Sequence, residues 1–242
     1  MPTDDPALLA DAVARRLTAE AAAADGQADS SPTGLHHVCR ATAQALAVAG
    51  CALHLLLEDG SPGVVTLSGP AVAPLADLAF TVGEGPTLDA FTLRRPVLAG
   101  DLGQHAARWP GFTQAAEDVG VRGVLSFPLQ VGGMTLGVLD LYATRPRSLD
   151  DRETALALAF ADLATSMVLD GPVGGTNRAR EPLLDHHAEV HQAQGMVMVD
   201  LRVDLREALV RMRAHAFREG IPLIAVARSI LQGVRLPAAG ND

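Results

Sequence analysis

The chain has 242 residues and a formal net charge of −9 at pH 7, and 48% of its residues are hydrophobic. This apolar share excludes wholesale disorder, and no apolar run reaches the roughly 20 residues of a membrane-spanning helix. The two cysteines, Cys39 and Cys51, are too few for a disulfide scaffold and lack the spacing of a zinc site.

The charge is unevenly distributed along the chain. Residues 1–184 hold 12 arginines and 21 acidic residues, whereas residues 185–242 hold 7 of each, so the acidic excess belongs entirely to the first part. The sequence contains no lysine. Arginine forks onto phosphate and stacks on bases, which suits nucleic acid, although a GC-rich genome explains the same usage. The acidic residues 1–6 do not resemble a signal peptide, and we expect a cytoplasmic protein with reduced thiols.

The first elements are two helices and a hairpin. We predict helices at residues 6–24 and 35–49, separated by a polar break at residues 25–32. Residues 51–58 alternate at Leu53, Leu55 and Leu57, as a strand packed on a core does. A turn at residues 59–63 and a return strand at residues 64–68 complete the hairpin.

A second hairpin is predicted at residues 124–131 and 134–142, around the two-residue turn Gly132-Gly133. Pro128 cannot donate a ladder hydrogen bond, so we expect it at a bulge or an edge. Asp150 and Asp151 open a helix whose apolar stripe contains Leu156, Phe160, Leu163 and Met167. Sequential hairpins with flanking helices predict an antiparallel sheet covered by helices, in the α+β class, and exclude a doubly wound nucleotide-binding fold.

A Gly-rich linker at residues 171–177 leads into an all-α region. Apolar and polar residues then follow a heptad-like spacing at Leu183, His187, Val190, Gln194, Val197 and Leu201. Packing of one amphipathic helix on its own domain explains this seam, and we favour it. A parallel homodimer is the alternative.

The next helix is amphipathic and basic. Asp204 is its expected N-cap, with Glu207 three residues later, and Leu205, Ala208, Leu209, Met212 and Ala216 form its packing face. The remaining surface carries Arg206 and Arg213 together with a stripe of Arg211, His215 and Arg218. These side chains can bind phosphate or guanine edges, or they can form an ordinary solvated face.

A third helix follows Gly220, which can end the preceding helix in the left-handed conformation, and Pro222 is expected at its first position. Its packing stripe is predicted to contain Leu223, Val226, Ala227, Ile230 and Leu231. Arg228 lies off this stripe and either extends the basic surface or is a lone exposed arginine.

Four segments resemble GAF domains, in the order expected for that fold. They are residues 81–90 with the turn Gly83-Glu84-Gly85-Pro86, residues 95–102, residues 109–112 and residues 121–129. Residues 192–198 resemble the first-helix signature of ANTAR domains, and the Glu207-Ala208-Leu209, Arg213, Ala216, Leu223 and Val226-Ala227 positions resemble their second and third helices. The chain departs from these patterns at Thr87, where cysteine is frequent, at Gln194, where lysine is common, and at Ile221, Pro222 and Ile224, where basic residues are usual.

The resemblance implies an α+β GAF-like antiparallel sheet flanked by helices, followed by a three-helix ANTAR domain. We therefore expect an N-terminal helix and polar break (1–32), a GAF-like sensor (33–170), a linker (171–181), an ANTAR domain (182–236) and a tail (237–242). The resemblance further implies a signal-responsive regulator that binds dual-hairpin RNA and promotes transcription antitermination. The alternative is a ligand-sensing or protein-interaction dimer module with little RNA affinity.

The expected RNA-binding residues are Gln194, Arg206, Arg211, Arg213, His215, Arg218 and Arg228. The acidic first domain, with its opposite charge balance, could cover this arginine face as an electrostatic off-state. The expected partners are thus a hairpin-containing transcript leader, a second copy of the chain and a small molecule in the GAF domain, with no membrane.

A GAF ligand would lie between sheet and helices against Leu53, Leu55, Val65, Phe127 and Leu139, although core packing explains these residues as well and is favoured. Catalysis finds no support in the sequence. The adjacent histidine pairs His36-His37 and His186-His187 diverge on a helix, and the Gly83-Glu84-Gly85-Pro86 turn lacks the lysine and length of a phosphate loop. We expect no enzymatic activity, no metal and no cofactor.

Overall fold

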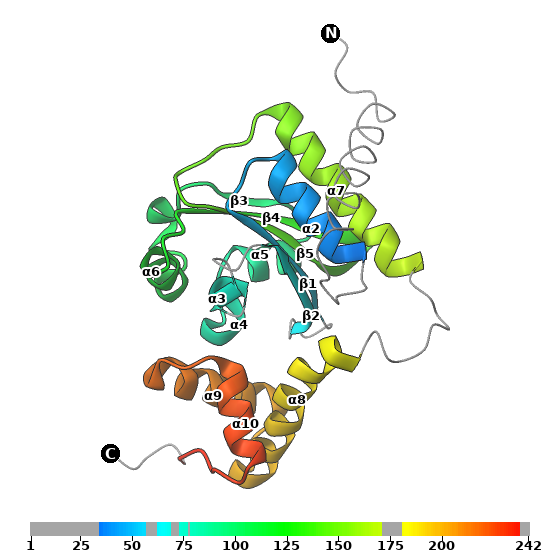
Figure 1. Ribbon diagram of the computed structural model, residues 1–242. Helices are drawn as coiled ribbons and strands as arrows, with labels where there is room; N and C mark the ends of the chain where they lie inside the picture. The colour runs from blue at the N-terminus through cyan, green and yellow to red at the C-terminus, as the bar shows by residue number, and fades with distance from the viewer. Residues whose placement is uncertain (1–33, 57–61, 69–72, 77, 171–180, 238–242) are drawn as a thin grey trace, which may run out of the picture.

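The computed structural model describes residues 34–56, 62–68, 73–76, 78–170 and 181–237 (Figure 1). The predicted helix at residues 6–24, the linker at residues 171–177 and most of the turn at residues 59–63 lie outside the described residues. The first domain contains α2 (Gly34–Ala45), β1 (Gly50–Leu56), β2 (Pro62–Ser68), α3 (Ala73–Ala76), α4 (Leu78–Val82), α5 (Pro86–Leu93), β3 (Val97–Ala99), η2 (Leu102–His105), α6 (Pro110–Asp118), β4 (Gly123–Val131), β5 (Met134–Ala143) and α7 (Asp151–Asp170).

The five strands form one sheet in the order β2-β1-β5-β4-β3, and all of its neighbouring pairs are antiparallel. Val131 pairs with Met134, so the predicted Gly132-Gly133 turn is confirmed, with Gly132 at φ 55. Pro128 lies where β4 continues past the end of β3, one residue before a register shift. The missing amide hydrogen of Pro128 therefore costs the sheet no bond to β3.

The helix predicted at residues 35–49 ends four residues early, at Ala45. The chain turns there because Ala47 adopts a left-handed conformation at φ 49, and β1 begins at Gly50. The short helices α3 to α6 had no counterpart among the predicted elements. They are too short to show the periodicity that identifies a helix from sequence.

One face of the sheet packs against α2 and α7 (Figure 1). Strand alternation directs Cys51, Leu53, Leu125, Phe127, Leu139 and Leu141 to this face, and all are fully or almost fully buried. Cys51 lies in this layer, where burial raises the pKa of its thiol well above the ordinary value, with neighbouring Cys39 adding to the effect. Both cysteines are therefore buried, unreactive thiols.

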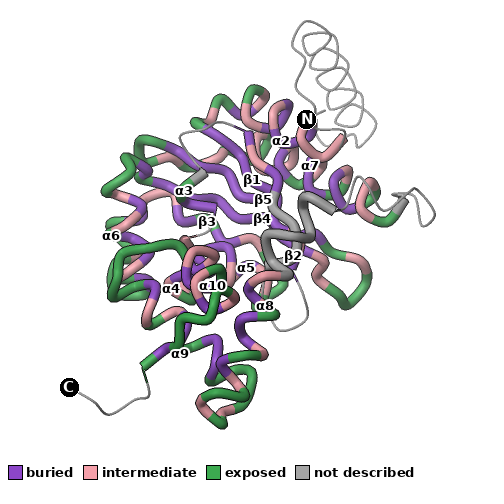
Figure 2. Tube along the Cα trace, turned by 60° about the horizontal axis from the view of Figure 1, so that its bottom comes forward, coloured by how far each residue is buried: buried purple, intermediate pink, exposed green. Residues whose placement is uncertain are grey.

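The opposite face lies under α3, α4, α5 and α6 and holds a second core (Figure 1). Ala52, Val124, Val138 and Tyr142 reach it from the strands, and Figure 2 shows the central strands buried along most of their length. Trp109 and Phe112 close it from the start of α6. The sheet thus separates two apolar layers, each covered by its own helices.

The turn Gly83-Glu84-Gly85-Pro86 joins α4 to α5. Gly83 and Gly85 adopt φ 76 and φ 132, which side-chain-bearing residues rarely do. One carboxylate oxygen of Glu84, Oε1, accepts hydrogen bonds from the Gly111 amide at 2.7 Å and the Phe112 amide at 3.1 Å. Glu84 therefore caps the N-terminus of α6, which gives the turn a structural role.

The C-terminal domain consists of α8 (Glu181–Leu201), α9 (Leu205–Glu219) and α10 (Leu223–Leu231). The Asp204 cap is confirmed, because its Oδ1 accepts from the Glu207 amide at 2.7 Å, and Gly220 ends α9 at φ 64. Pro222 is the N-cap of α10, one position earlier than predicted. The predicted packing residues of α9 and α10 form the core, except Leu205, which is 52% exposed.

Val190 and Val197 of the heptad-like seam are each 3% exposed in the core that α8 shares with α9 and α10. In this structure, the described part of the seam therefore packs α8 against its own domain. The alternative of a parallel dimer would require Val190 and Val197 to leave this core, and it stays a prediction. The side chains of Leu183 and His187 lie outside the described residues.

The two domains are in contact. α9 lies against α4, and α8 lies against β2 (Figure 1). In the parts that the structure describes, the hydrogen bonds between the domains include one from Arg213 Nε to the Phe80 carbonyl at 2.7 Å and one from the Leu223 amide to Thr81 Oγ1 at 3.3 Å. Among the described residues, no helix is both long enough and apolar enough to cross a membrane.

Candidate functional site

The basic surface predicted on α9 divides into two stripes. Arg211, His215 and Arg218 form the first, with Arg206 exposed nearby. Arg211 Nε donates to Glu207 at 2.9 Å, and an Arg218 amino group lies 2.9 Å from His215 Nδ1. Ion pairs at exposed positions contribute little stability, so these guanidinium groups can exchange a carboxylate for a phosphate at small cost.

Arg228 lies on α10, outside the residues that form the domain core. Its side chain is 48% exposed, and its Nε donates to Glu189 of α8 at 2.8 Å. The pairing ties α10 to α8 at their solvent edge. Arg228 is therefore an exposed arginine with a carboxylate partner, and it is less exposed than Arg218, whose side chain is 59% exposed.

The prediction that Gln194 contacts RNA needs correction. Gln194 is only 4% exposed, and its Nε2 donates to the Leu205 carbonyl at 2.7 Å. This hydrogen bond fixes the start of α9 to α8 inside the domain. Since the side chain is enclosed, it is not part of the surface in this conformation.

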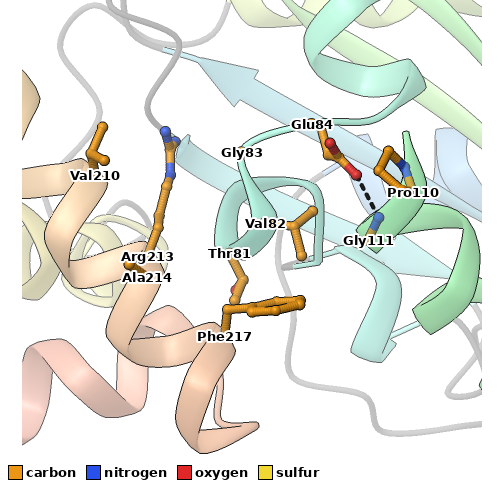
Figure 3. A pocket seen from close by; sticks show the side chains of 10 residues that line it. All are labelled: Thr81, Val82, Gly83, Glu84, Pro110, Gly111, Val210, Arg213, Ala214 and Phe217. Atoms are coloured by element: carbon orange, nitrogen blue, oxygen red, sulfur yellow. Dashed lines mark hydrogen bonds between the residues drawn. The ribbon is translucent and has the colours of Figure 1, made fainter. Parts of the chain in front are cut away.

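The second stripe of α9 faces the first domain. It contains Val210, Arg213 and Phe217, which follow one another at helical spacing (Figure 3). The guanidinium of Arg213 lies against Gly83: a Cβ built on Gly83 would lie 3.4 Å from one of its nitrogens. The absence of a side chain at Gly83 thus lets the guanidinium approach the α4–α5 turn.

A cavity of about 460 Å³ separates this stripe from the first domain (Figure 3). Its lining residues are Thr81, Val82, Gly83, Glu84, Pro110, Gly111, Val210, Arg213, Ala214 and Phe217. Arg213 also lines a second cavity of about 510 Å³, which includes Asp89, Arg108 and Trp109. Arg213 therefore stands between the two cavities at the domain boundary.

The first domain contains a buried polar cluster beneath α4 and α5. Asp140 of β5 is fully buried and accepts hydrogen bonds from Ser126 Oγ at 2.5 Å, Thr87 Oγ1 at 2.7 Å and the Tyr142 hydroxyl at 3.4 Å. His54 Nε2 lies 3.1 Å from the same carboxylate. Within the described part of the chain, neither ring nitrogen of His54 has a partner in good hydrogen-bond geometry.

This cluster connects to the domain boundary through α4. The ring of Phe80 packs on that of His54, with centroids 5.3 Å apart, while the Phe80 carbonyl receives Arg213. Through Phe80, α4 thus contacts the polar cluster with a side chain and α9 with a backbone carbonyl.

The residues predicted to line a GAF ligand site lie on the other face of the sheet. Leu53, Phe127 and Leu139 are completely buried against α2 and α7, Leu55 packs on the same core, and the side chain of Val65 lies outside the described residues. Core packing, the favoured interpretation, matches this placement. No cluster of three or more metal-ligating side chains occurs in the described ranges.

The predicted site residues did not include His54, Ser126, Asp140 and Phe217. A signal for the first three was present, because each is a polar residue inside an otherwise apolar strand, on the face opposite the leucines. Phe217 stood among charged residues on the exposed side of a helix. An aromatic side chain in that position is unusual enough to mark a surface contact.

Comparison with known proteins identifies both domains. Residues 30–168 match the family model described as GAF domain, and residues 182–231 match the one described as ANTAR domain. No curated protein matches this chain.

Solved structures similar to the chain include two GAF domains from phosphoenolpyruvate-protein phosphotransferases. The Acinetobacter domain is 14% identical, with a TM-score of 0.47, covering 69% of this chain and 95% of that one. The Coxiella burnetii domain is 18% identical, with a TM-score of 0.46, covering 72% and 99%. Free methionine-R-sulfoxide reductase from Neisseria meningitidis is 16% identical, with a TM-score of 0.46, covering 69% and 91%. Because the GAF match spans more than half of its length, the chain belongs to the GAF domain family, and it continues into a C-terminal ANTAR domain.

Proposed function

We propose that this protein promotes transcription antitermination by binding stem-loop RNA through α9, and that its GAF domain controls this binding by docking on α9. GAF domains are sensory and ANTAR domains act as RNA-binding antitermination modules, so the chain joins a sensor to an RNA-binding regulator. The observation that carries the proposal is the hydrogen bond from Arg213 of α9 to the Phe80 carbonyl of the GAF domain.

The exposed arginines support the RNA part of the proposal. Arg206, Arg211 and Arg218 lie outside the contact with the GAF domain and carry guanidinium groups that fork onto phosphates. Four of the seven arginines of residues 185–242 lie on α9, so these charges are concentrated on one helix rather than spread over the domain. Such a strip suits the backbone of a hairpin.

The docked arrangement supports control by the sensor. In the docked arrangement, Arg213 donates a hydrogen bond to the Phe80 carbonyl, and Val210 and Phe217 lie opposite the GAF domain (Figure 3). Docking leaves Arg206 and Arg218 exposed, so the GAF domain covers one stripe of the basic surface rather than all of it. The off-state is therefore one in which the Phe80 carbonyl holds Arg213 away from RNA while the first stripe stays exposed.

The polar cluster supports a sensing role for the GAF domain. A small molecule that satisfies the buried nitrogens of His54 would press on Phe80, whose carbonyl holds Arg213. A displacement of α4 would then weaken the hydrogen bond that docks α9. The signal itself is thus expected to act through a single short helix.

The RNA surface is tested by replacing Arg206, Arg211 and Arg218 together with alanine. Loss of three phosphate contacts should weaken binding of a two-stem-loop RNA about 100-fold at 0.1 M salt and lower the slope of log affinity against log salt by about 2–3. Filter binding at several salt concentrations measures both quantities. The matched control replaces Arg95, Arg145 and Arg152, three exposed arginines of the GAF domain, and should change neither. Equal affinity for both triple variants would instead favour a ligand-sensing or protein-interaction module.

Docking is tested by the sign of the charge placed at Val82, which lines the cavity opposite Phe217 and Arg213. Val82→Arg should repel Arg213 and raise RNA affinity about 2- to 5-fold, whereas Val82→Glu should attract it and lower affinity by a similar factor. Fluorescence anisotropy with labelled RNA measures the change. The dependence on sign should disappear when Arg213 is also replaced with alanine. If both Val82 variants shift affinity in the same direction, docking through Arg213 is not the cause.

A further inference from the structure

The C-terminal half of α9 carries an aromatic side chain that the packing of the ANTAR domain does not use. Phe217 is 66% exposed, whereas the other seven Phe, Trp and Tyr side chains are buried or half-buried. The domain core takes Met212 and Ala216 from this part of α9 and leaves Phe217 beside it. Burying such a ring stabilises a protein, so an exposed one fits a contact outside its own domain.

Basic side chains flank this ring. Arg213 precedes Phe217 by one helical turn and lines the same cavity, and Arg218 follows it directly with a side chain 59% exposed. An exposed phenyl ring with one guanidinium group a helical turn away and a second on the neighbouring stripe combines the two features that bind single-stranded nucleic acid, a stacking platform and phosphate donors. An acidic protein surface would be drawn to the arginines alone and would gain little from the ring.

We propose that Phe217 stacks on an unpaired base of a hairpin loop while Arg213 and Arg218 hold the flanking phosphates. This inference rests on the proposed RNA-binding function and assigns its loop contact to named side chains of α9. Bases in a stem are already paired and stacked, so a phenyl ring can reach only those that a loop leaves open.

Docking withholds Arg213 from the RNA. In the docked conformation Phe217 points across the cavity towards Val82 and Pro110 (Figure 3). The Cε2 of its ring lies 3.7 Å from where a Cβ at Gly111 would be. Phe217 is 66% exposed in this conformation, whereas Arg213 is held by the Phe80 carbonyl, so release of α9 frees Arg213 to bind a phosphate beside the stacked base.

The test uses the full chain in two backgrounds, the natural sequence and the Val82→Arg variant that releases α9. Phe217→Leu keeps an apolar side chain without an aromatic face, and Phe217→Trp keeps the aromatic face. The probes are a pool of two-stem-loop RNAs with randomised loops and a blunt RNA duplex of equal length. In the released background Phe217→Leu should weaken binding of the stem-loop pool about 5- to 100-fold, and Phe217→Trp should not, while neither changes duplex binding.

Other outcomes overturn the inference and show which step failed. If Phe217→Leu binds the pool as tightly as the parent in the released background, the ring does not stack on RNA. If Phe217→Ala raises affinity in the natural background and leaves the released one unchanged, the ring serves only to pack the two domains. If neither parent binds either RNA, the proposed function fails as well. A helical circular dichroism signal equal to that of the parent shows that each variant folds.

Discussion

Replacing Asp140 with leucine should lower the free energy of unfolding of the GAF domain by about 3–5 kcal/mol. The carboxylate is fully buried, and it is the shared acceptor for Ser126, Thr87 and Tyr142. Leucine fills a similar space but accepts no hydrogen bond, so these hydroxyls lose that acceptor away from water. Each buried polar group left in this way costs about 1–3 kcal/mol.

Urea unfolding followed by tryptophan fluorescence measures this effect in the GAF domain specifically. Trp109 is the single tryptophan of the chain and is 2% exposed in that domain. Ser126→Ala removes one donor and keeps the acceptor, and it should cost only about 1 kcal/mol. An unchanged urea midpoint for Asp140→Leu would mean that the polar cluster does not hold α5 to the sheet.

The sheet was predictable because its information is local. Alternation at Leu53, Leu55 and Leu57 identified the first strand, and two adjacent glycines identified the turn between β4 and β5. Antiparallel hairpins pair strands that are neighbours in sequence. The two hairpins of the GAF domain therefore followed from short segments, whereas the pairing of β1 with β5 joins strands that are far apart in the sequence.

The polar cluster could not be assembled from the sequence. His54, Thr87, Ser126 and Asp140 come from four elements spread over 87 positions of the chain. Only the folded sheet brings β1, β5 and β4 side by side, and only α5 brings Thr87 to them. The ligand site predicted from the sequence was instead placed at the leucines, which lie on the other face of the sheet.

Gln194 shows a different error. Its spacing from Val190 and Val197 placed it in the buried seam of α8, which is where it lies. The resemblance to ANTAR domains, where lysine is common at this position, placed it on the RNA surface. The helical periodicity was the better guide, since it depends on the packing of this chain rather than on a different side chain in relatives.

The contact of Arg213 with the GAF domain was only half predictable. The opposite charge balance of the two parts indicated docking, and α9 was expected to be the docked element. The acceptor, however, is the backbone carbonyl of Phe80. A pattern of residue types does not identify which backbone carbonyl a side chain will contact. Placing it requires the folded positions of α4 and the glycine turn that follows.

The central claim is that α9 faces either the GAF domain or RNA, and a reversible cross-link tests it most directly. Val82 and Ala214 line the same cavity from opposite domains, so cysteines at both positions can be joined by a bifunctional maleimide with a reducible spacer. The natural Cys39 and Cys51 are fully buried, and the raised pKa of Cys51 keeps its thiol protonated, so neither competes for the reagent.

The measurement is the RNA affinity of this double-cysteine protein before cross-linking, after it, and after cleavage of the spacer. Holding the docked state removes the binding-competent population, so the cross-linked protein should bind the two-stem-loop pool about tenfold more weakly or worse, and cleavage should restore binding. The single-cysteine variants treated with the same reagent should show no change. Equal affinity in the cross-linked and cleaved forms would contradict the claim, because RNA would then bind while the GAF domain still covers α9.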